Sequence, residues 1–210
     1  MLTTLIKTTA ILSLVAAFAQ AETKIENGKF DIDSMHSKVG FEISHLVISS
    51  VEGTFKVFSG TIEIDPTFSK SQVNAEVEIG SVDTGVTKRD DHLKSADFFD
   101  QKKFPKMIFK STSIEGTPDS FKLKGDLTLH GEKKPVVFEG KFLGAVTDGY
   151  GNRKTAFKVS GKIKRQDFGL KWSSMVEAGP VVGDEVTITL NVEAAKQVEK
   201  PAEKAPAKKK

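Results

Sequence analysis

The sequence predicts an all-β fold: an eight-stranded antiparallel meander that closes into a barrel and carries one short helical segment. Two features of the chain lead to this prediction. Apolar and polar residues alternate along most of residues 22–193, and turn residues separate the alternating runs. Closure into a barrel removes the unpaired edges of such a sheet. A two-sheet sandwich is the alternative, because alternation alone does not distinguish the two architectures.

Eight runs of residues carry the strand prediction. Strict alternation, with one buried and one exposed face, occurs in residues 39–44, 73–79, 121–130 and 186–192. Less regular runs occupy residues 51–65, 106–115, 134–146 and 154–165. Short turn signals separate neighbouring runs, at Asp65-Pro66, Thr117-Pro118-Asp119 and Asp148-Gly149. Connections this short predict that strands consecutive in the sequence pair with each other.

Glycines in the apolar register favour a barrel with a cavity. Gly125, Gly140 and Gly161 stand where the alternation places inward-facing residues. Glycine weakens a strand, but it permits strong bends and leaves interior room. The apolar phase also changes from odd to even positions between Val57 and Phe58, which predicts a bulge or a corner. The alternative is a filled core in which the glycines only relieve crowding.

Residues 87–99 (TKRDDHLKSADFF) interrupt the strand pattern. They are rich in helix formers and predict one helix or two short turns, with Thr87 as a candidate N-cap. A helix in a barrel protein commonly covers an open end. We therefore expect Phe98 and Phe99 to plug or line the mouth of the barrel.

The first residues predict a cleaved signal peptide. Lys7 supplies a positive start, residues 10–18 are apolar, and Ala19-Gln20-Ala21 has the A-x-A pattern of a cleavage site. The apolar run is well short of the ~20 residues of a membrane span. The mature chain would begin at Glu22 and be exported.

The last residues differ in composition from the body of the chain. Residues 194–210 are rich in Lys, Ala and Pro and predict a disordered tail. The functional alternative is a weak contact between this basic tail and an anionic membrane surface. The predicted organisation is a signal peptide at 1–21, a β-barrel domain at 22–193 and a tail at 194–210.

Composition excludes several classes of protein. The 210 residues include no Cys, so an exported domain cannot rely on disulfides. The formal net charge is +3, but six lysines lie in residues 196–210, and residues 22–195 carry 24 basic and 26 acidic residues. A nearly neutral body lacks the concentrated basic face that binds phosphate backbones, so no nucleic-acid partner is expected. Fifteen Phe against one Trp and one Tyr make the aromatic content almost purely apolar.

No sequence motif predicts catalysis. The chain lacks G-x-S-x-G, H-E-x-x-H and G-x-x-x-x-G-K. None of the four His shows metal-ligand spacing, so neither a metal nor a cofactor is expected, and only a site assembled from distant strands stays open. The cluster Arg89-Asp90-Asp91-His92 fits either an acid–base site or a set of ion pairs that ties the helix to the barrel rim. We favour the structural role.

Four motifs taken together resemble the YceI-like family. They are His36-Ser37-x-Val39-x-Phe41 with His45, the run from Arg89 to Phe99 followed by Phe104-Pro105, Gly125-x-Leu127-Thr128-x-His130-Gly131 with Lys134, and Arg165-x-Asp167-Phe168-Gly169. The resemblance implies an extended, lipocalin-like barrel with a long hydrophobic pocket for polyisoprenoid or related amphiphilic lipids, without established catalysis. It also implies a periplasmic or secreted protein, and dimers are known in the family.

These observations converge on a binding protein, not an enzyme, whose ligand is an amphiphilic lipid such as an isoprenoid or a quinone-like molecule. The predicted pocket residues are Phe41, Ile43, His45, Phe55, Phe98, Phe109, Leu127, Phe138, Phe157 and Trp172. Of these, His45 is the candidate contact for a polar head group. Two alternatives stay open: a lipid-modifying hydrolase or isomerase that uses Asp90 or His92, and a ligand-free structural or stress-response domain with a filled core.

Overall fold

The computed structural model describes residues 24–176 and 179–197. Its strands are β1 (Gly28–Ile32), β2 (Lys38–His45), β3 (Ser49–Phe55), β4 (Phe58–Ile64), β5 (Gln72–Glu78), β6 (Val82–Asp83), β7 (Lys106–Thr117), β8 (Ser120–Leu129), β9 (Glu132–Thr147), β10 (Arg153–Lys164), β11 (Met175–Val176), β12 (Gly179–Pro180) and β13 (Val182–Lys196). Its helices are α1 (Thr87–Lys94) and the 3-10 turns η1 (Phe68–Lys70), η2 (Ile79–Ser81) and η3 (Arg165–Phe168). No helix in this part of the chain has the length and apolar character to cross a bilayer. The predicted signal peptide, and the predicted tail beyond Gln197, lie outside the described residues.

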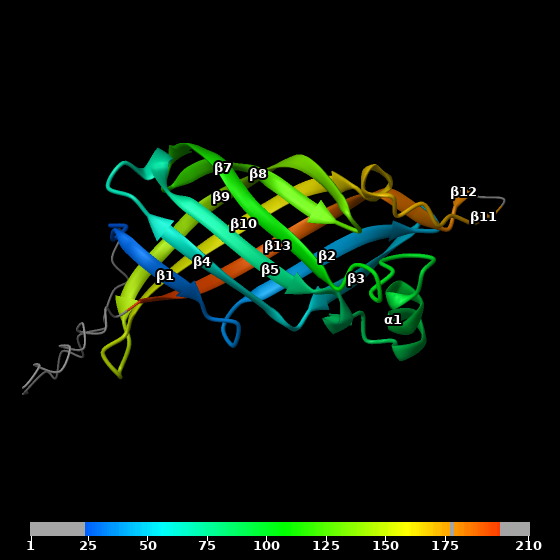
Figure 1. Cartoon of the computed structure of the whole chain (residues 1–210), viewed down its shortest axis with the longest axis horizontal. Coiled ribbons are helices and arrows are strands. Elements are labelled where there is room, and N and C mark those ends of the chain that lie inside the picture. The colour runs from blue at the N-terminus through cyan, green and yellow to red at the C-terminus, as the bar shows by residue number, and fades with distance from the viewer. Residues whose placement is uncertain (1–23, 177–178, 198–210) are drawn as a thin grey trace, which may run out of the picture.

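Eight strands close into an antiparallel barrel (Figure 1). Their order around the barrel is β1-β4-β5-β7-β8-β9-β10-β13, and β13 pairs back with β1. The strands β2, β3 and β6 extend the same sheet from β13. The predicted all-β class, the eight-stranded lipocalin-like barrel and the short helical segment are confirmed.

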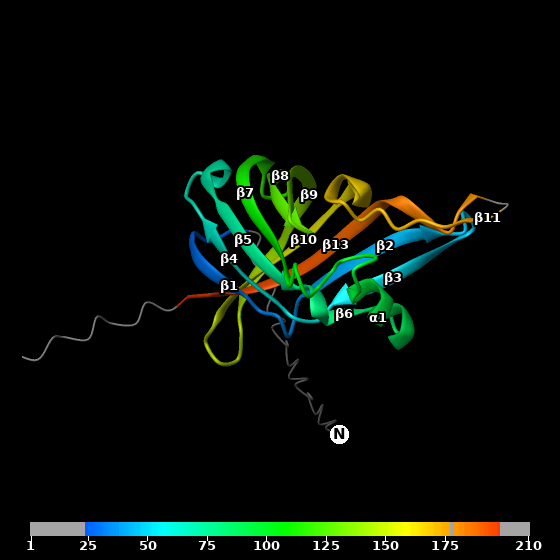
Figure 2. The same ribbon diagram turned by 45° about the vertical axis from the view of Figure 1, so that its right-hand side comes forward.

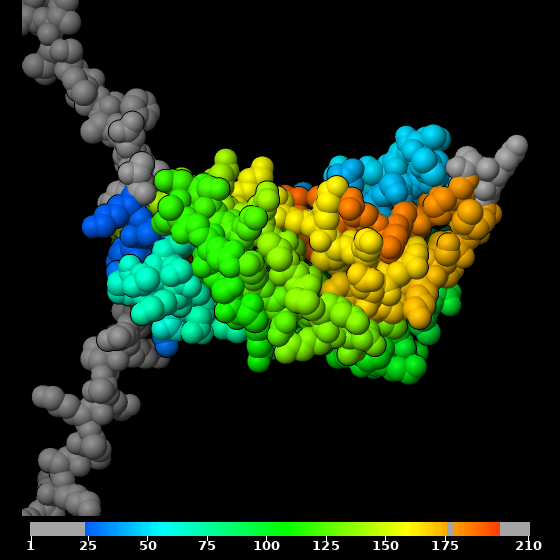
Figure 3. Space-filling view, turned by 90° about the horizontal axis from the view of Figure 1, so that it is seen from above, coloured from blue at the N-terminus to red at the C-terminus, as the bar shows by residue number. Residues whose placement is uncertain are grey.

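The barrel is elongated, and two of its walls each consist of two shorter strands that lie end to end. Along β13, Ile32 of β1 pairs with Ala194 and Lys38 of β2 pairs with Asn191, so β1 and β2 lie in line. The chain passes from β3 to β4 through a bend at residues 56–57. Figure 2 shows β1 at one end of the body and α1 beside β3 at the other, and Figure 3 shows the elongated shape from above.

The bend between β3 and β4 is the corner that the change of apolar phase predicts. Phe55 is 6% exposed before the bend, Val57 in the bend is 55% exposed, and Ile62 beyond it is 7% exposed. The inward-facing positions therefore move from odd to even residue numbers at this point. A local change in strand geometry of this kind re-aims every side chain that follows.

The closing strand is longer than the sequence predicts. β13 continues to Lys196, so residues 194–196, which composition assigns to the tail, are part of the barrel wall. Ala194 and Phe30 have no exposed surface. The composition of residues 194–196 resembles that of the tail, but pairing with β1 on one side and β10 on the other orders them. The last strand therefore continues three residues beyond the predicted domain boundary at 193.

The polar cluster of the helical segment has a structural role. Thr87 makes no capping hydrogen bond, and Val86 occupies the N-cap position instead. Asp90 is buried, and its Oδ1 accepts hydrogen bonds from the backbone N and the Oγ1 of Thr84 at 2.9 and 2.6 Å. Arg89 donates to Thr84 as well. These bonds tie α1 to the segment that follows β6.

Candidate functional site

Two cavities occupy the interior of the barrel. The first, which we call the strand cavity, measures about 140 Å³ and lies among side chains of β1, β2, β4, β5, β7–β10 and β13. The second, the helix cavity, measures about 270 Å³ and lies toward α1 and η3. Val39, Met107 and Ile188 line both, so the two cavities adjoin at this waist. Together they reach the lower part of the range of about 300–1,000 Å³ that small-molecule sites occupy.

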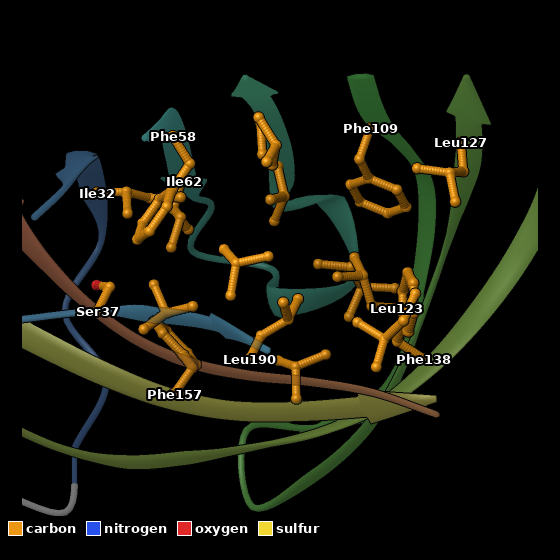
Figure 4. A pocket seen from close by; sticks show the side chains of 18 of the residues that line it. Ile32, Ser37, Phe58, Ile62, Phe109, Leu123, Leu127, Phe138, Phe157 and Leu190 are labelled. Carbon is orange, nitrogen blue, oxygen red and sulfur yellow. The ribbon is translucent and has the colours of Figure 1, made fainter. Parts of the chain in front are cut away.

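The strand cavity is almost entirely apolar. Figure 4 shows side chains that converge on it from opposite walls, among them Ile32, Phe109 and Leu190. Its polar contributions are limited to Ser37, Lys38 and two further serines, Ser59 and Ser71. A surface of this kind matches hydrocarbon, because it offers few groups that would have to give up hydrogen bonds to water.

The wall formed by β13 supports a hollow interior. Val186, Ile188, Leu190 and Val192 point inward in the strand register, yet all four stay only partly buried. In a filled core such residues would lose nearly all of their exposed surface. Their residual exposure is toward the lumen, and it indicates apolar area that a ligand can cover.

Glycines in the wall seat phenylalanine rings of the neighbouring strand. A Cβ on Gly140 would lie 2.4 Å from the ring of Phe121, and one on Gly161 would lie 2.5 Å from the ring of Phe138. Both pairs are direct cross-strand partners. The sequence predicts that these glycines leave room in the interior. Instead, the phenylalanine rings fill the space beside them. The rings lie against the backbone of the wall, and they project less far into the lumen than they would if a residue with a Cβ stood in place of each glycine.

Aromatic rings cover the helix end of the barrel. His92 packs edge-on against Phe98 and Trp172, with ring centroids 5.0 and 5.4 Å apart, and Phe98 lies 5.1 Å from Trp172. Phe99 packs edge-on against Phe55 at 6.0 Å. Phe98 and Phe99 both line the helix cavity, which is the position predicted for them.

The ionisable side chains that line the cavities are all basic. Among the residues that the structure describes, His45, Arg89, His92 and Arg165 line the helix cavity, and Lys38 is the one ionisable residue on the strand cavity. No Asp or Glu is among the described residues that line either space. The interior therefore combines an apolar tube with a basic end.

Each of the ten predicted site residues lines one of the two cavities. Phe109, Leu127, Phe138 and Phe157 line the strand cavity. Phe41, Ile43, His45, Phe55, Phe98 and Trp172 line the helix cavity. Their contact with a lipid stays a prediction.

The structure adds lining residues that the sequence analysis did not select. Phe121 and Leu123 share the register of Leu127, so the alternation already contained their signal. Phe68 belongs to η1, outside any strand, and packs edge-on against Phe121 at 5.4 Å. No periodic pattern could identify it. Arg165 belongs to one of the four motifs that resemble the family, but only the fold places it on the helix cavity.

One cluster outside the cavities has metal-ligand chemistry. Among the described residues, the ligand atoms of Asp33, His36 and Glu193 lie within 4.8 Å of one another. Lys154 already supplies a positive charge there, with Nζ 2.6 Å from Asp33 and 3.3 Å from Glu193. Hydrogen bonds from Lys154 and His36 hold the pKa of Asp33 well below its usual range. The cluster is an ion-pair clamp that joins the break between β1 and β2 to β10 and β13.

Comparison with known proteins places this barrel in a family. The model of the YceI-like domain matches residues 30–194. Protein YceI of Escherichia coli O6:H1 is 40% identical over 170 residues, which cover 80% of this chain and 86% of that protein. The chain belongs to the YceI-like family. Its YceI-like domain includes every residue that lines the two cavities.

Solved structures share the YceI-like fold. The Campylobacter jejuni YCEI protein is 34% identical with a TM-score of 0.65, covering 79% of this chain and 96% of that one. Burkholderia cenocepacia BcnA is 24% identical with a TM-score of 0.66 over 77% of this chain and 98% of that one. A polyisoprenoid binding domain from Saccharophagus degradans is 15% identical with a TM-score of 0.59, covering 82% and 100%. The last two establish similarity of fold alone.

Proposed function

We propose that this protein is an exported carrier that holds one long-chain amphiphilic lipid, of the isoprenoid or quinone-like class, inside its barrel. The observation that carries the proposal is the pair of adjoining apolar cavities along the barrel. Burial of each CH₂ group gains about 0.8 kcal/mol, so a long chain has ample driving force to enter. Part of this gain is offset by the ordering of the ligand.

The family relationship supports this ligand class. The Saccharophagus degradans domain, whose fold this chain shares, is described as polyisoprenoid binding. The apolar lining agrees with such a ligand, because a hydrocarbon needs surface contact and no hydrogen bonds. In this proposal the chain is exported to the periplasm after cleavage behind Ala21, and its basic tail makes weak contact with anionic lipid.

The geometry favours binding over the two alternatives. Asp90 accepts hydrogen bonds from Thr84, and His92 lies 3.1 Å from Asp97, so each of these groups already has a structural partner. A ligand-free domain would have a filled interior, and the two cavities disfavour that alternative. Turnover of a bound lipid that is lost in His92→Ala, with binding kept, would instead support an enzyme.

The test is to purify the mature protein, extract it with organic solvent and identify released lipid by mass spectrometry. A fluorescent isoprenoid is then titrated into delipidated protein, and its uptake is measured. Ile188→Phe narrows the waist between the cavities and is expected to lower uptake at least tenfold. Val137→Phe makes the same kind of change on an exposed, outward-facing position of β9 and should bind like wild type. Wild-type protein that releases no lipid and takes up no probe would refute the carrier function.

Export is tested separately. Protein recovered from the periplasmic fraction should have the mass of a chain that starts at Glu22. Protein that retains residues 1–21 in the cytoplasmic fraction would contradict the localisation without affecting lipid binding.

A further inference from the structure

Arg165 lies in the wall of the helix cavity and forms no ion pair with a carboxylate of the described residues. The residue is 4% exposed. Its Nε donates to the carbonyl of Gly183 at 2.7 Å, and its Nη1 donates to the carbonyl of Leu170. No Asp or Glu in the described parts of the chain forms an ion pair with it. Burial lowers the pKa of the Arg165 guanidinium, which nevertheless keeps its charge.

The charge of the neighbouring Asp184 acts against burial and raises the pKa of Arg165, but within the described residues the two side chains form no ion pair. Asp184 follows Gly183, and its Oδ1 accepts a hydrogen bond from the backbone N of Gln166 at 3.0 Å. The two bonds of Arg165 go to neutral carbonyl oxygens and leave its Nη2 without a protein acceptor among the described residues. A buried charge is costly unless a counter-charge compensates it, and Asp184 does so without direct contact, so an anion in the cavity would supply a directly paired counter-charge.

Arg89 repeats the arrangement on α1. Its Nε donates to Thr84 Oγ1 at 2.7 Å and its Nη2 to the Thr84 carbonyl at 2.9 Å. It lines the helix cavity and, within the described residues, makes no ion pair. Arg153, which lines neither cavity, differs: its Nε lies 2.7 Å from the carboxylate of Glu26. Thus, within the described residues, the two arginines on the cavity form no ion pair, whereas Arg153 forms one with Glu26.

We propose that the helix cavity binds the anionic head group of the ligand, a carboxylate or a phosphate, against Arg165 and Arg89. The apolar tail then passes the waist into the strand cavity. Guanidinium groups bind both kinds of oxyanion through paired, charge-assisted hydrogen bonds. His45 and His92 line the same space and supply further N–H donors. This inference rests on the proposed carrier function and narrows its ligand to an anionic amphiphile.

Matched ligands test the head group. Affinities are measured for hexadecanoate against hexadecanol, and for geranylgeranyl phosphate against geranylgeraniol, so that the tail stays constant in each pair. Wild-type protein is expected to prefer the anion at least tenfold in one pair or both, and the pair with the larger ratio identifies carboxylate or phosphate as the head. Arg89→Met should reduce the preference, and Arg89→Met with Arg165→Met should abolish it while the alcohol still binds. Lys164→Met removes a positive charge from an exposed neighbour and should leave the preference unchanged.

Orientation provides a second test that needs no variant, which matters because Arg165 also holds β13 and η3. Trp172 is the single tryptophan of the chain and lines the helix cavity. A palmitate brominated beside its carboxylate should quench Trp172 fluorescence more strongly than one brominated at the end of the chain. The opposite order would overturn the proposed orientation.

The outcomes separate the two proposals. Wild-type protein that binds neither member of either pair would refute the carrier function itself. Equal affinity for acid and alcohol, or a preference that survives the double arginine variant, would refute the anionic head group and leave the carrier function intact.

Discussion

The two halves of the barrel interior are built in different ways. The strand cavity is lined almost wholly by alternate residues of paired strands, so its apolar surface follows directly from the period of the β-strand. The helix cavity also takes residues from α1, from the loop that holds Phe98 and Phe99, and from the segment around Arg165. A regular sheet thus supplies the surface for a hydrocarbon chain, and the irregular segments supply the charge that would select a head group.

Packing at the closure of the barrel also differs from packing at the helix cavity. Where β1 and β13 close the barrel, Phe30 and Ala194 are fully buried. At the helix cavity, Phe41 and Ile43 stay only partly buried. The difference indicates that the closure carries stability, while the helix cavity retains apolar surface for binding.

The largest expected effect is a loss of stability at the closure of the barrel, and it tests whether the closure rather than the helix cavity carries stability. Phe30→Ala should lower the free energy of unfolding by about 3–5 kcal/mol, because it opens a void where the barrel closes. Phe41→Ala should cost less than half as much and should weaken lipid binding instead. Urea unfolding monitored by circular dichroism gives both values. Equal losses of stability would show that the helix cavity is packed as solidly as the closure.

The ion-pair clamp at the break between β1 and β2 should make the second-largest contribution. Asp33→Asn should destabilise the protein by roughly 1–3 kcal/mol at pH 7, because Lys154, which stays largely buried, loses the nearer of its two carboxylate partners and keeps Glu193. Asp126→Asn, which removes a more exposed pair with Lys133, should cost less than about 1 kcal/mol.

The clamp also predicts a pH dependence with a defined sign. The folded-state pKa of Asp33 lies below the unfolded value of about 3.9, so its stabilisation is complete above that pH and is lost as the pH falls further. The difference in stability between wild type and Asp33→Asn should therefore shrink below about pH 4. A difference that stays constant down to pH 2 would contradict this account.

A smaller effect should reveal how the strand cavity keeps its width. In Gly140→Ala the new methyl group displaces the ring of Phe121 into the lumen, and affinity for a long-chain lipid should fall about tenfold, or 1.4 kcal/mol. Gly149→Ala is the matched control, since no atom lies near its Cβ position. Adding Phe121→Leu to Gly140→Ala should restore binding. Failure of this rescue would show that the loss arose from damage to the strand and not from the displaced ring.

The smallest effect concerns the cover of the helix cavity. Trp172→Phe keeps an aromatic ring against Phe98 and His92 but loses contact area, so affinity should fall only about two- to fivefold, which corresponds to ~0.5–1 kcal/mol. Tyr150→Phe changes a ring that is almost fully exposed and should have no effect. A loss beyond twentyfold at Trp172 would mean that the head-group end dominates binding.

The sequence by itself determined the class of fold, the corner after β3 and the inward face of most strands. Alternation has a period of two residues and is complete within one strand, so the eight predicted site residues that lie in strands fell on a cavity wall, whereas Phe98 and Trp172 lie in loops outside that pattern. It did not reveal β1, because five residues carry too little of the pattern.

Only the tertiary structure decided what those faces enclose. The seat of Phe121 on Gly140, the clamp between Asp33 and Lys154, and the position of Arg165 on the cavity each join segments distant in the chain. Local periodicity contains no information on which strand pairs with which, in what register, or which charge finds a partner. Those outcomes depend on closure of the whole barrel, because only closure brings the partners together.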